Sequence, residues 1–207
     1  MVARILAVSV ALTLAASGGA LACQGKTMAA LDDTFKNPDP GWGPPDAAAA
    51  FTAGGLVLKP PANGSAWRWN PNYMIDGSDL CVSVVNPSEL SSRTDVGDVG
   101  VWFWSQNAQN FYTATLSLDG SVSIDRLVNG VWHVVLQPTP SGAVQTKPGA
   151  VNEVEVTVKG NTGSFYVNGT KITDFRGEAP PRGGPPGIYA ESGGTAVNWV
   201  FPRVQLF

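Results

Sequence analysis

Residues 110–135 read NFYTATLSLDGSVSIDRLVNGVWHVV, three runs of β-branched, aromatic and aliphatic residues separated by Asp119-Gly120 and Asn129-Gly130. A third dipeptide of this kind, Asn168-Gly169, lies between two similar runs further along the chain. Asn-Gly and Asp-Gly readily adopt the positive φ angles that a two-residue type I′ hairpin requires. Each dipeptide therefore predicts a strand reversal, and together they predict an antiparallel meander in the second half of the chain.

Similar runs recur outside this stretch at spacings near ten residues, separated by many of the 24 glycines and 16 prolines. The expected strands are Gly55–Lys59, Ala66–Asn70, Asp79–Val85, Val99–Ser105, Phe111–Leu118, Val122–Val128, Val131–Gln137, Asn152–Lys159, Gly163–Val167, Lys171–Phe175, Gly187–Ala190 and Val197–Phe207. This spacing predicts an all-β fold, an antiparallel β-sandwich with little or no helix. The Pro-rich segment 37–45 is expected to be a loop, and Ala47–Phe51 is the one place where a helical turn is expected.

The first 22 residues have the pattern of a secretory signal peptide. Arg4 precedes an apolar run that is too short to cross a bilayer, and Ala20-Leu21-Ala22 is a small-residue cleavage site. We therefore expect a secreted or periplasmic protein without a transmembrane segment. Cleavage would leave 207 − 22 = 185 residues, which suits one domain. We expect a Pro/Gly-rich segment at 23–50 that packs on a single sandwich at 51–207.

The charge of the mature chain disfavours polyanionic partners. The whole chain has 13 basic and 16 acidic residues, and removal of the signal peptide takes away only Arg4, leaving 12 − 16 = −4. Because no basic stripe or cluster is visible, nucleic acid and anionic membranes are not expected as partners. No cofactor motif is present and no cofactor is expected. The oligomeric state is left open.

The two cysteines, Cys23 and Cys81, predict a disulfide, because an exported chain meets an oxidising compartment. The alternative is a lipid anchor on Cys23. Bacterial lipoprotein signals usually place Leu three positions before the cysteine, where this chain has Ala20. A metal site built on the cysteines is disfavoured, since the chain offers only one histidine to join them.

Alternation along the strand Val99–Ser105 predicts two apolar faces. One face carries Val99, Val101 and Phe103, and the opposite face carries Trp102 and Trp104. We therefore expect a loop, another chain or a ligand to cover the tryptophans.

Several short motifs occur in the order found in a known superfamily. They are GVWFW (100–104), NFYTA (110–114), LDGSV (118–122), RLVNGVW (126–132), NEVEVTV (152–158), GSFYVNG (163–169) and GIYA (187–190). Over residues 30–207 the chain resembles the concanavalin A-like (laminin-G-like) jelly-roll superfamily. It is most similar to the secreted bacterial 3-keto-disaccharide hydrolase, or glucanase-like, domains. The resemblance implies two curved antiparallel sheets with ligands on the concave face or at its rim.

The first functional hypothesis is a lectin-like domain that binds oligo- or polysaccharide on an aromatic-lined sheet face. Sugar rings have flat C–H faces that stack on aromatic rings, and their hydroxyls hydrogen-bond to amides and carboxylates. The candidate ligand-binding residues are Trp102, Trp104, Tyr112, Gln106, Asn110, Trp67 and Trp69, with Asn107 and Gln109 in the same turn. The alternatives are core packing for the aromatic residues and an ordinary polar turn for the amides.

The second hypothesis is a hydrolase that cleaves 3-keto-glycosides or glucans. Such chemistry usually needs two carboxylates flanking the scissile bond. Glu153 and Glu155 point the same way from one strand, with Cβ atoms about 6–7 Å apart, and are the candidate catalytic pair. The alternative, exposed glutamates on a solvated sheet face, is favoured, so the sequence leans towards a non-catalytic protein.

Other polar residues give weaker indications. The pairs Asp76/Asp79 and Asp95/Asp98 are interpreted as turn caps, because no dense Asp/Asn loop supplies the six to eight oxygens of a calcium site. The single histidine, His133, is expected to face solvent or a neighbouring strand. A third hypothesis is a non-catalytic cell-envelope module that binds protein through a sheet edge or an exposed aromatic patch.

Overall fold

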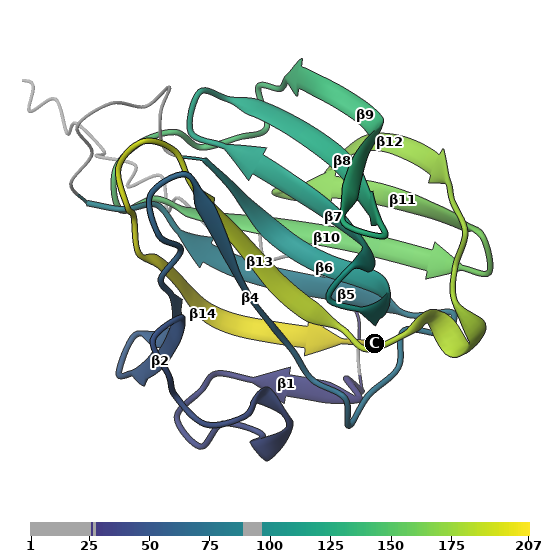
Figure 1. Ribbon diagram of the computed structural model, residues 1–207, viewed down its shortest axis with the longest axis horizontal. Coiled ribbons are helices and arrows are strands. Elements are labelled where there is room, and N and C mark those ends of the chain that lie inside the picture. The colour runs from purple at the N-terminus through teal and green to yellow at the C-terminus, as the bar shows by residue number, and fades with distance from the viewer. Residues whose placement is uncertain (1–25, 27, 89–96) are drawn as a thin grey trace, which may run out of the picture.

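The computed structural model describes residue 26 and residues 28–88 and 97–207, which form two antiparallel sheets packed face to face (Figure 1). The strands are β1 (Leu31–Asp33), β2 (Ala49–Thr52), β3 (Gly55–Leu58), β4 (Gly64–Trp69), β5 (Asp79–Val85), β6 (Asp98–Asn107), β7 (Asn110–Ser117), β8 (Ser121–Val128), β9 (Val131–Pro140), β10 (Val151–Lys159), β11 (Thr162–Val167), β12 (Thr170–Arg176), β13 (Gly187–Ser192) and β14 (Trp199–Leu206). Within the described ranges the only helices are two 3₁₀ turns, Pro40–Trp42 and Pro181–Gly183. Neither is long or apolar enough to cross a membrane.

One sheet has eight strands and the other has six. The eight-stranded sheet has the order β12-β11-β10-β5-β14-β3-β2, and β1 also pairs with β14. The six-stranded sheet has the order β4-β13-β6-β7-β8-β9. The all-β prediction is therefore confirmed, and the edge strands β9 and β12 lie on the same side of the sandwich (Figure 1).

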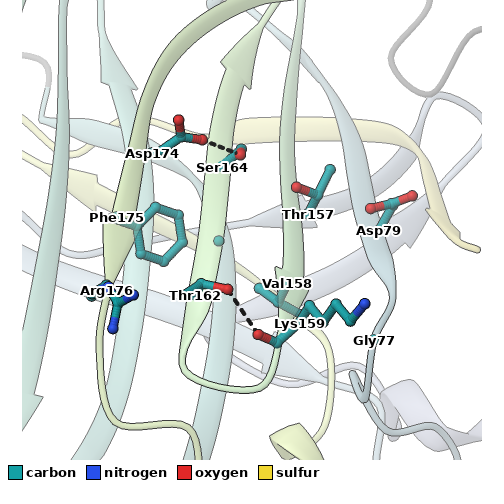
Figure 2. Close-up of a pocket in the computed structure, with 11 residues that line it drawn as sticks. Gly77, Asp79, Thr157, Val158, Lys159, Thr162, Ser164, Asp174, Phe175 and Arg176 are labelled. Carbon is teal, nitrogen blue, oxygen red and sulfur yellow. Dashed lines mark hydrogen bonds between the residues drawn. The ribbon is translucent and has the colours of Figure 1, made fainter.

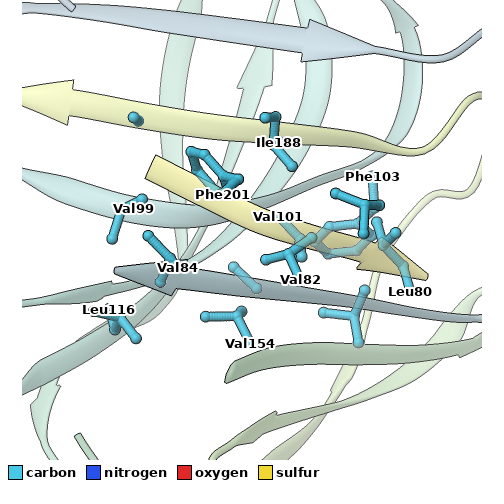
Figure 3. Close-up of a cluster of buried hydrophobic side chains, with 14 of the residues drawn as sticks. Leu80, Val82, Val84, Val99, Val101, Phe103, Leu116, Val154, Ile188 and Phe201 are labelled. Carbon is cyan, nitrogen blue, oxygen red and sulfur yellow. The ribbon is translucent and has the colours of Figure 1, made fainter. Parts of the chain in front are cut away.

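The core fills the space between the sheets. Figure 3 shows valine, leucine and phenylalanine side chains meeting there, among them Val82 of β5, Val101 of β6 and Val154 of β10, each at most 1% exposed. The burial of each such side chain stabilises the fold by about 1.5–3 kcal/mol relative to leaving it in water. The predicted inward face of the strand at 152–159 is confirmed, since its valines at 154, 156 and 158 are all buried.

The dipeptides at the turns do reverse the chain. Asn129-Gly130 and Asn168-Gly169 form two-residue turns in which all four φ angles lie between 50° and 80°, as type I′ requires. Asp119-Gly120 also reverses the chain, between β7 and β8, but the predicted type I′ geometry is wrong there. There the loop is three residues long, from 118 to 120, and only Gly120 has a positive φ, which is typical of a turn that ends in a glycine bulge.

All twelve strands predicted after residue 54 are present, but two earlier ones were not predicted. The helical turn expected at Ala47–Phe51 is wrong, because Ala49–Thr52 is β2 and pairs with β3. The alanines there favour helix only weakly, and strand pairing together with packing of Phe51 against the core outweighs that preference. Since β1 also lies within residues 23–50, part of this segment belongs to the sheet itself.

Trp102 and Trp104 do not share a face, contrary to the alternation of the sequence. Trp104 has a φ of 45°, and the pairing of β6 with β7 changes register after Phe103. This bulge turns the Trp104 side chain into the main core, where it contacts Phe103 and Phe175 at ring-centroid distances of 5.4 and 5.5 Å. Trp102 alone remains on the outer face of the six-stranded sheet.

The predicted signal peptide, its cleavage site and Cys23 lie outside the described residues, as does Asp95. Cys81 is buried on β5. The disulfide and the alternative lipid anchor therefore both stay predictions.

Candidate functional site

The outer face of the six-stranded sheet is strongly curled, and we call it the concave face. Tyr189 on β13 and Trp132 on β9 are four strand-to-strand steps apart. On a flat sheet this separation would be about 19 Å. Their ring centroids are only 6.2 Å apart, so the sheet curls and these two long side chains lean towards each other above its outer face.

An aromatic cluster fills one part of the concave face. It consists of Trp67, Trp69, Trp102, Phe111, Leu127 and Tyr189. Trp102 is fully buried at its centre, with Trp67 at 5.6 Å and Trp69 at 5.4 Å between ring centroids. Other side chains of the same sheet thus cover Trp102, and no loop or second chain is needed for this. The Nε1 of Trp102 has no hydrogen-bond partner among the described residues.

An open cleft of about 300 Å³ lies beside the aromatic cluster, and we call it the acidic cleft. It is lined by Asp98, Thr113, Thr115, Asp125, Trp132, Tyr189 and Glu191. These residues come from five strands because β13, β6, β7, β8 and β9 are neighbours in the sheet. Trp132 is 45% exposed, so its ring forms an apolar wall next to carboxyl and hydroxyl groups.

The three carboxyl groups of the acidic cleft hold protons unusually tightly. Burial, followed by the nearby charges of Glu191 and Asp125, raises the pKa of Asp98 to about 7. Burial also raises the pKa of Asp125, although Ser123 Oγ donates a hydrogen bond of 2.9 Å to Asp125 Oδ2. The pKa of Glu191 is raised by burial and by Asp125, and the Tyr189 hydroxyl donates a hydrogen bond to Glu191.

Such groups can accept hydrogen bonds from ligand hydroxyls when ionised and donate one when protonated. Within the part of the chain that the structure describes, no group of three His, Cys, Asp or Glu side chains is arranged to hold a metal ion.

The predicted ligand-binding aromatic residues separate into two places. Trp67, Trp69 and Trp102 meet in the aromatic cluster on the concave face. Trp104 and Tyr112 lie instead in the main core, each 2% exposed. The Tyr112 hydroxyl accepts a hydrogen bond of 2.9 Å from the Glu178 amide.

The predicted amide residues form the turn between β6 and β7. Asn107 Oδ1 accepts hydrogen bonds from the Gln109 amide at 2.8 Å and from Asn110 Nδ2 at 3.1 Å. Asn110 Oδ1 in turn accepts a hydrogen bond from the Asn129 amide. Gln106 is exposed. These contacts fit the alternative of a polar turn, and none of the four amides lines the acidic cleft.

The candidate catalytic pair lies on the outer face of the eight-stranded sheet, away from the concave face. Glu155 forms an ion pair of 2.8 Å with Lys26, which also reaches Asp79 at 2.5 Å. Glu153 is not solvated as expected but 4% exposed, and burial raises its pKa to about 7. The two glutamates do share a face, but neither lines a described pocket.

Two further hollows lie beside the loop around Trp42 and on the eight-stranded sheet. A groove of about 280 Å³ separates the loop around Trp42 from β4, and Trp67 and Trp69 form one of its walls. A wider hollow of about 640 Å³ crosses β10, β11 and β12 (Figure 2). Its carboxylates are already engaged, since Asp174 accepts a hydrogen bond from Ser164 and pairs with Lys171, and Asp79 pairs with Lys26.

Sequence reasoning missed most of the acidic cleft. The sequence predicts only a turn cap at Asp98. It gives no prediction of a site role for Asp125, Trp132, Tyr189 and Glu191. The turn between β7 and β8 does carry a usable indication, because it places Asp125 opposite Thr113. Glu191 and Tyr189 arrive through pairing of β13 with β6, about 90 residues away in sequence, which no local pattern indicates.

Comparisons with known proteins agree on the fold. No model of a known protein family matches the chain, and no curated protein matches its sequence. The carbohydrate-binding module CBM66 from Bacillus subtilis is 16% identical, with a TM-score of 0.58 over 78% of this chain and 91% of that one. A glycoside hydrolase family 16 endo-glucanase from Bacteroides ovatus is 12% identical, with a TM-score of 0.59 over 86% and 99%.

The carbohydrate recognition domain of Emp46p is 16% identical, with a TM-score of 0.54 over 77% of this chain and 84% of that one. These likenesses extend over most of each structure, and at such low identity they concern the fold. Together with the two antiparallel sheets and the curled outer face, they show that the chain is a concanavalin A-like jelly-roll sandwich.

Proposed function

We propose that the protein is a secreted or periplasmic, lectin-like domain that binds neutral carbohydrate in the acidic cleft and along the adjoining aromatic cluster. The observation that carries this proposal is the exposed ring of Trp132 beside three carboxyl groups in an open cleft. An apolar wall with a few convergent polar groups is typical of small-molecule sites. The printed names of the similar structures, a carbohydrate-binding module and a carbohydrate recognition domain, support the same ligand class.

The cleft suits uncharged sugars better than acidic ones. A sugar ring stacked on Trp132 would place its hydroxyls near Asp125 and Glu191, which accept hydrogen bonds, and near the hydroxyls of Thr113 and Thr115. A uronate or sulfate group would instead bring another negative charge next to carboxylates in a partly buried site. This repulsion is costly where water screens it poorly.

A second candidate function is glycoside cleavage in the same cleft, and Asp98 favours it. Its pKa of about 7 suits a general acid, and Asp125 and Glu191 provide carboxylates nearby. Two carboxyl groups with separated pKa values are the usual requirement for hydrolysis of a glycosidic bond. The printed name of one similar structure, an endo-glucanase, also supports this candidate.

Both candidates can be tested on one array of neutral and acidic glycans, followed by calorimetry on any binder. Trp132→Ala should weaken binding about tenfold or more, because it removes an aromatic surface worth about 1.5–3 kcal/mol. Val151→Ala is the matched control, since Val151 is 46% exposed on the other sheet and should leave binding unchanged. Binding of a neutral glycan that Trp132→Ala leaves unchanged would contradict the proposed site. Release of reducing sugar that Asp98→Asn abolishes would establish the hydrolase instead.

A further inference from the structure

A second pocket of opposite charge lies on the other side of β8 and β9, and we call it the basic pocket. It has a volume of about 620 Å³ and opens between the edge strands β9 and β12. Alternate residues of the two strands serve the two sites. Asp125 and Trp132 line the acidic cleft, whereas their neighbours Arg126 and His133 line the basic pocket.

Two guanidinium groups reach the basic pocket from different sheets. Arg126 comes from β8 and Arg176 from the end of β12. Arg126 forms an ion pair of 2.5 Å with Glu178, and its guanidinium lies 5.2 Å from the centre of the Tyr112 ring. Arg176 is exposed and forms no ion pair with a described residue. The two arginines and Glu178 leave a net charge of +1 in a chain whose overall charge is −3.

The floor of the basic pocket is held in place by backbone contacts. Gly177 lies against Trp104 and Tyr112 so closely that an added Cβ would come within 2.9 Å of the Tyr112 hydroxyl. The Gly177 amide donates to the Asn161 carbonyl oxygen, and the next amide, that of Glu178, donates to the Tyr112 hydroxyl. The site is therefore preorganised, while the Glu178 carboxylate stays 75% exposed and can move aside.

We infer that the basic pocket binds the carboxylate of an acidic sugar, such as a uronic acid residue, between Arg126 and Arg176. A guanidinium can bind a carboxylate through two parallel hydrogen bonds. The Arg126 guanidinium already donates one hydrogen bond to an internal carboxylate, from Nη2 to Glu178 Oε2. The volume greatly exceeds that of a single oxyanion. The exposed side chains of Val134 and Val135 provide an apolar wall for the remainder of a sugar ring.

This inference does not depend on the proposed function, because the two sites share no lining residue. Glucuronic acid is the probe, glucose its neutral match, and inorganic sulfate distinguishes a sugar site from a general oxyanion site. In amide NMR titrations of the mature chain, glucuronic acid should shift Gly177 and Glu178 and leave the Trp132 indole unshifted. Glucose should not shift Gly177 and Glu178. Sulfate that binds as tightly as glucuronic acid would overturn the assignment to an acidic sugar.

Two exposed positions provide variants with opposite expected effects. Arg176→Gln should weaken glucuronic acid binding about tenfold, since it removes one of the two guanidinium groups. Glu178→Gln should strengthen binding severalfold, because the ligand no longer competes with an internal carboxylate. If the ion pair between Arg126 and Glu178 were merely structural, Glu178→Gln would leave the affinity for glucuronic acid unchanged or lower it. Either result would overturn the inference. So would unchanged affinity in Arg176→Gln.

Discussion

At the scale of the residue, the most informative group is Asp98, a carboxyl group that is partly buried next to two others. Its folded-state pKa of about 7 lies above its ordinary value of 3.8. The folded protein therefore binds a proton that the unfolded chain releases as the pH rises above 4. The resulting stabilisation is fully present below about pH 4 and is lost as the pH rises through 7.

We expect Asp98→Asn to flatten the dependence of stability on pH. In the native protein, Asp98 should lower the free energy of unfolding by up to about 4 kcal/mol between pH 4 and pH 8. Urea unfolding at several pH values measures this difference directly. Glu153→Gln is the control, because Glu153 has a similar pKa on the opposite sheet and the two effects should add. If the free energy of unfolding of Asp98→Asn changed with pH in parallel with that of the native protein, the raised pKa assigned to Asp98 would be contradicted.

At the scale of the element, the hairpin of β8 and β9 shows how strictly a turn can depend on one residue. Asn129 has a φ of 50°, which proline cannot adopt, and its amide donates a hydrogen bond of 3.1 Å to Asn110 Oδ1. Asn129→Pro should therefore destabilise the protein by about 2–4 kcal/mol through backbone strain and the lost hydrogen bond.

Asn129→Gly is the matched control for this hairpin. Glycine adopts positive φ without strain and keeps the amide, so we expect a change of less than about 1 kcal/mol. Hydrogen exchange should show the loss of protection in Asn129→Pro first along β9, since β9 pairs only with β8. Equal stability of the two variants would mean that the turn depends neither on a positive φ at residue 129 nor on the hydrogen bond of its amide.

The same scale explains what the sequence could and could not predict. Hairpins are set by residues a few positions apart, so the dipeptides at 129 and 168 predicted both turn and register. The bulge at Trp104 depends instead on a core space bounded by Phe175, more than 70 residues away, and strict alternation placed this tryptophan on the wrong face. The acidic cleft was missed for a related reason, because β13 brings Glu191 to Asp98 by pairing with β6.

At the scale of the whole molecule, the sandwich separates charge between its two candidate sites. The acidic cleft and the basic pocket lie back to back across β8 and β9, so each strand contributes alternate side chains to both. Such an arrangement would let one domain hold two different parts of a mixed glycan at once. The motifs at 100–104 and 126–132 predicted the jelly roll, but they could not predict this division, because it depends on which sheet faces remain open.

The attachment of the N-terminal segment to the sandwich also belongs to the scale of the whole molecule. We predict that a Cys23–Cys81 disulfide joins this segment to the eight-stranded sheet. Lys26 contacts Glu155, which pairs with Cys81 across the strands, so the chain three residues after Cys23 already lies beside β5. Such a bond would close a loop of 81 − 23 = 58 residues. It should stabilise the fold by about 4 kcal/mol through the entropy of the unfolded chain.

Intact-mass measurement of the exported protein should therefore give a chain that starts at Cys23 and is two hydrogens lighter than the dithiol. Reduction should lower the free energy of unfolding, and Cys23→Ser should lower it by a similar amount without further loss on reduction. An added diacylglycerol mass would show instead that Cys23 is a lipid anchor. Stability that is insensitive to reduction would show that the two sulfurs are not joined.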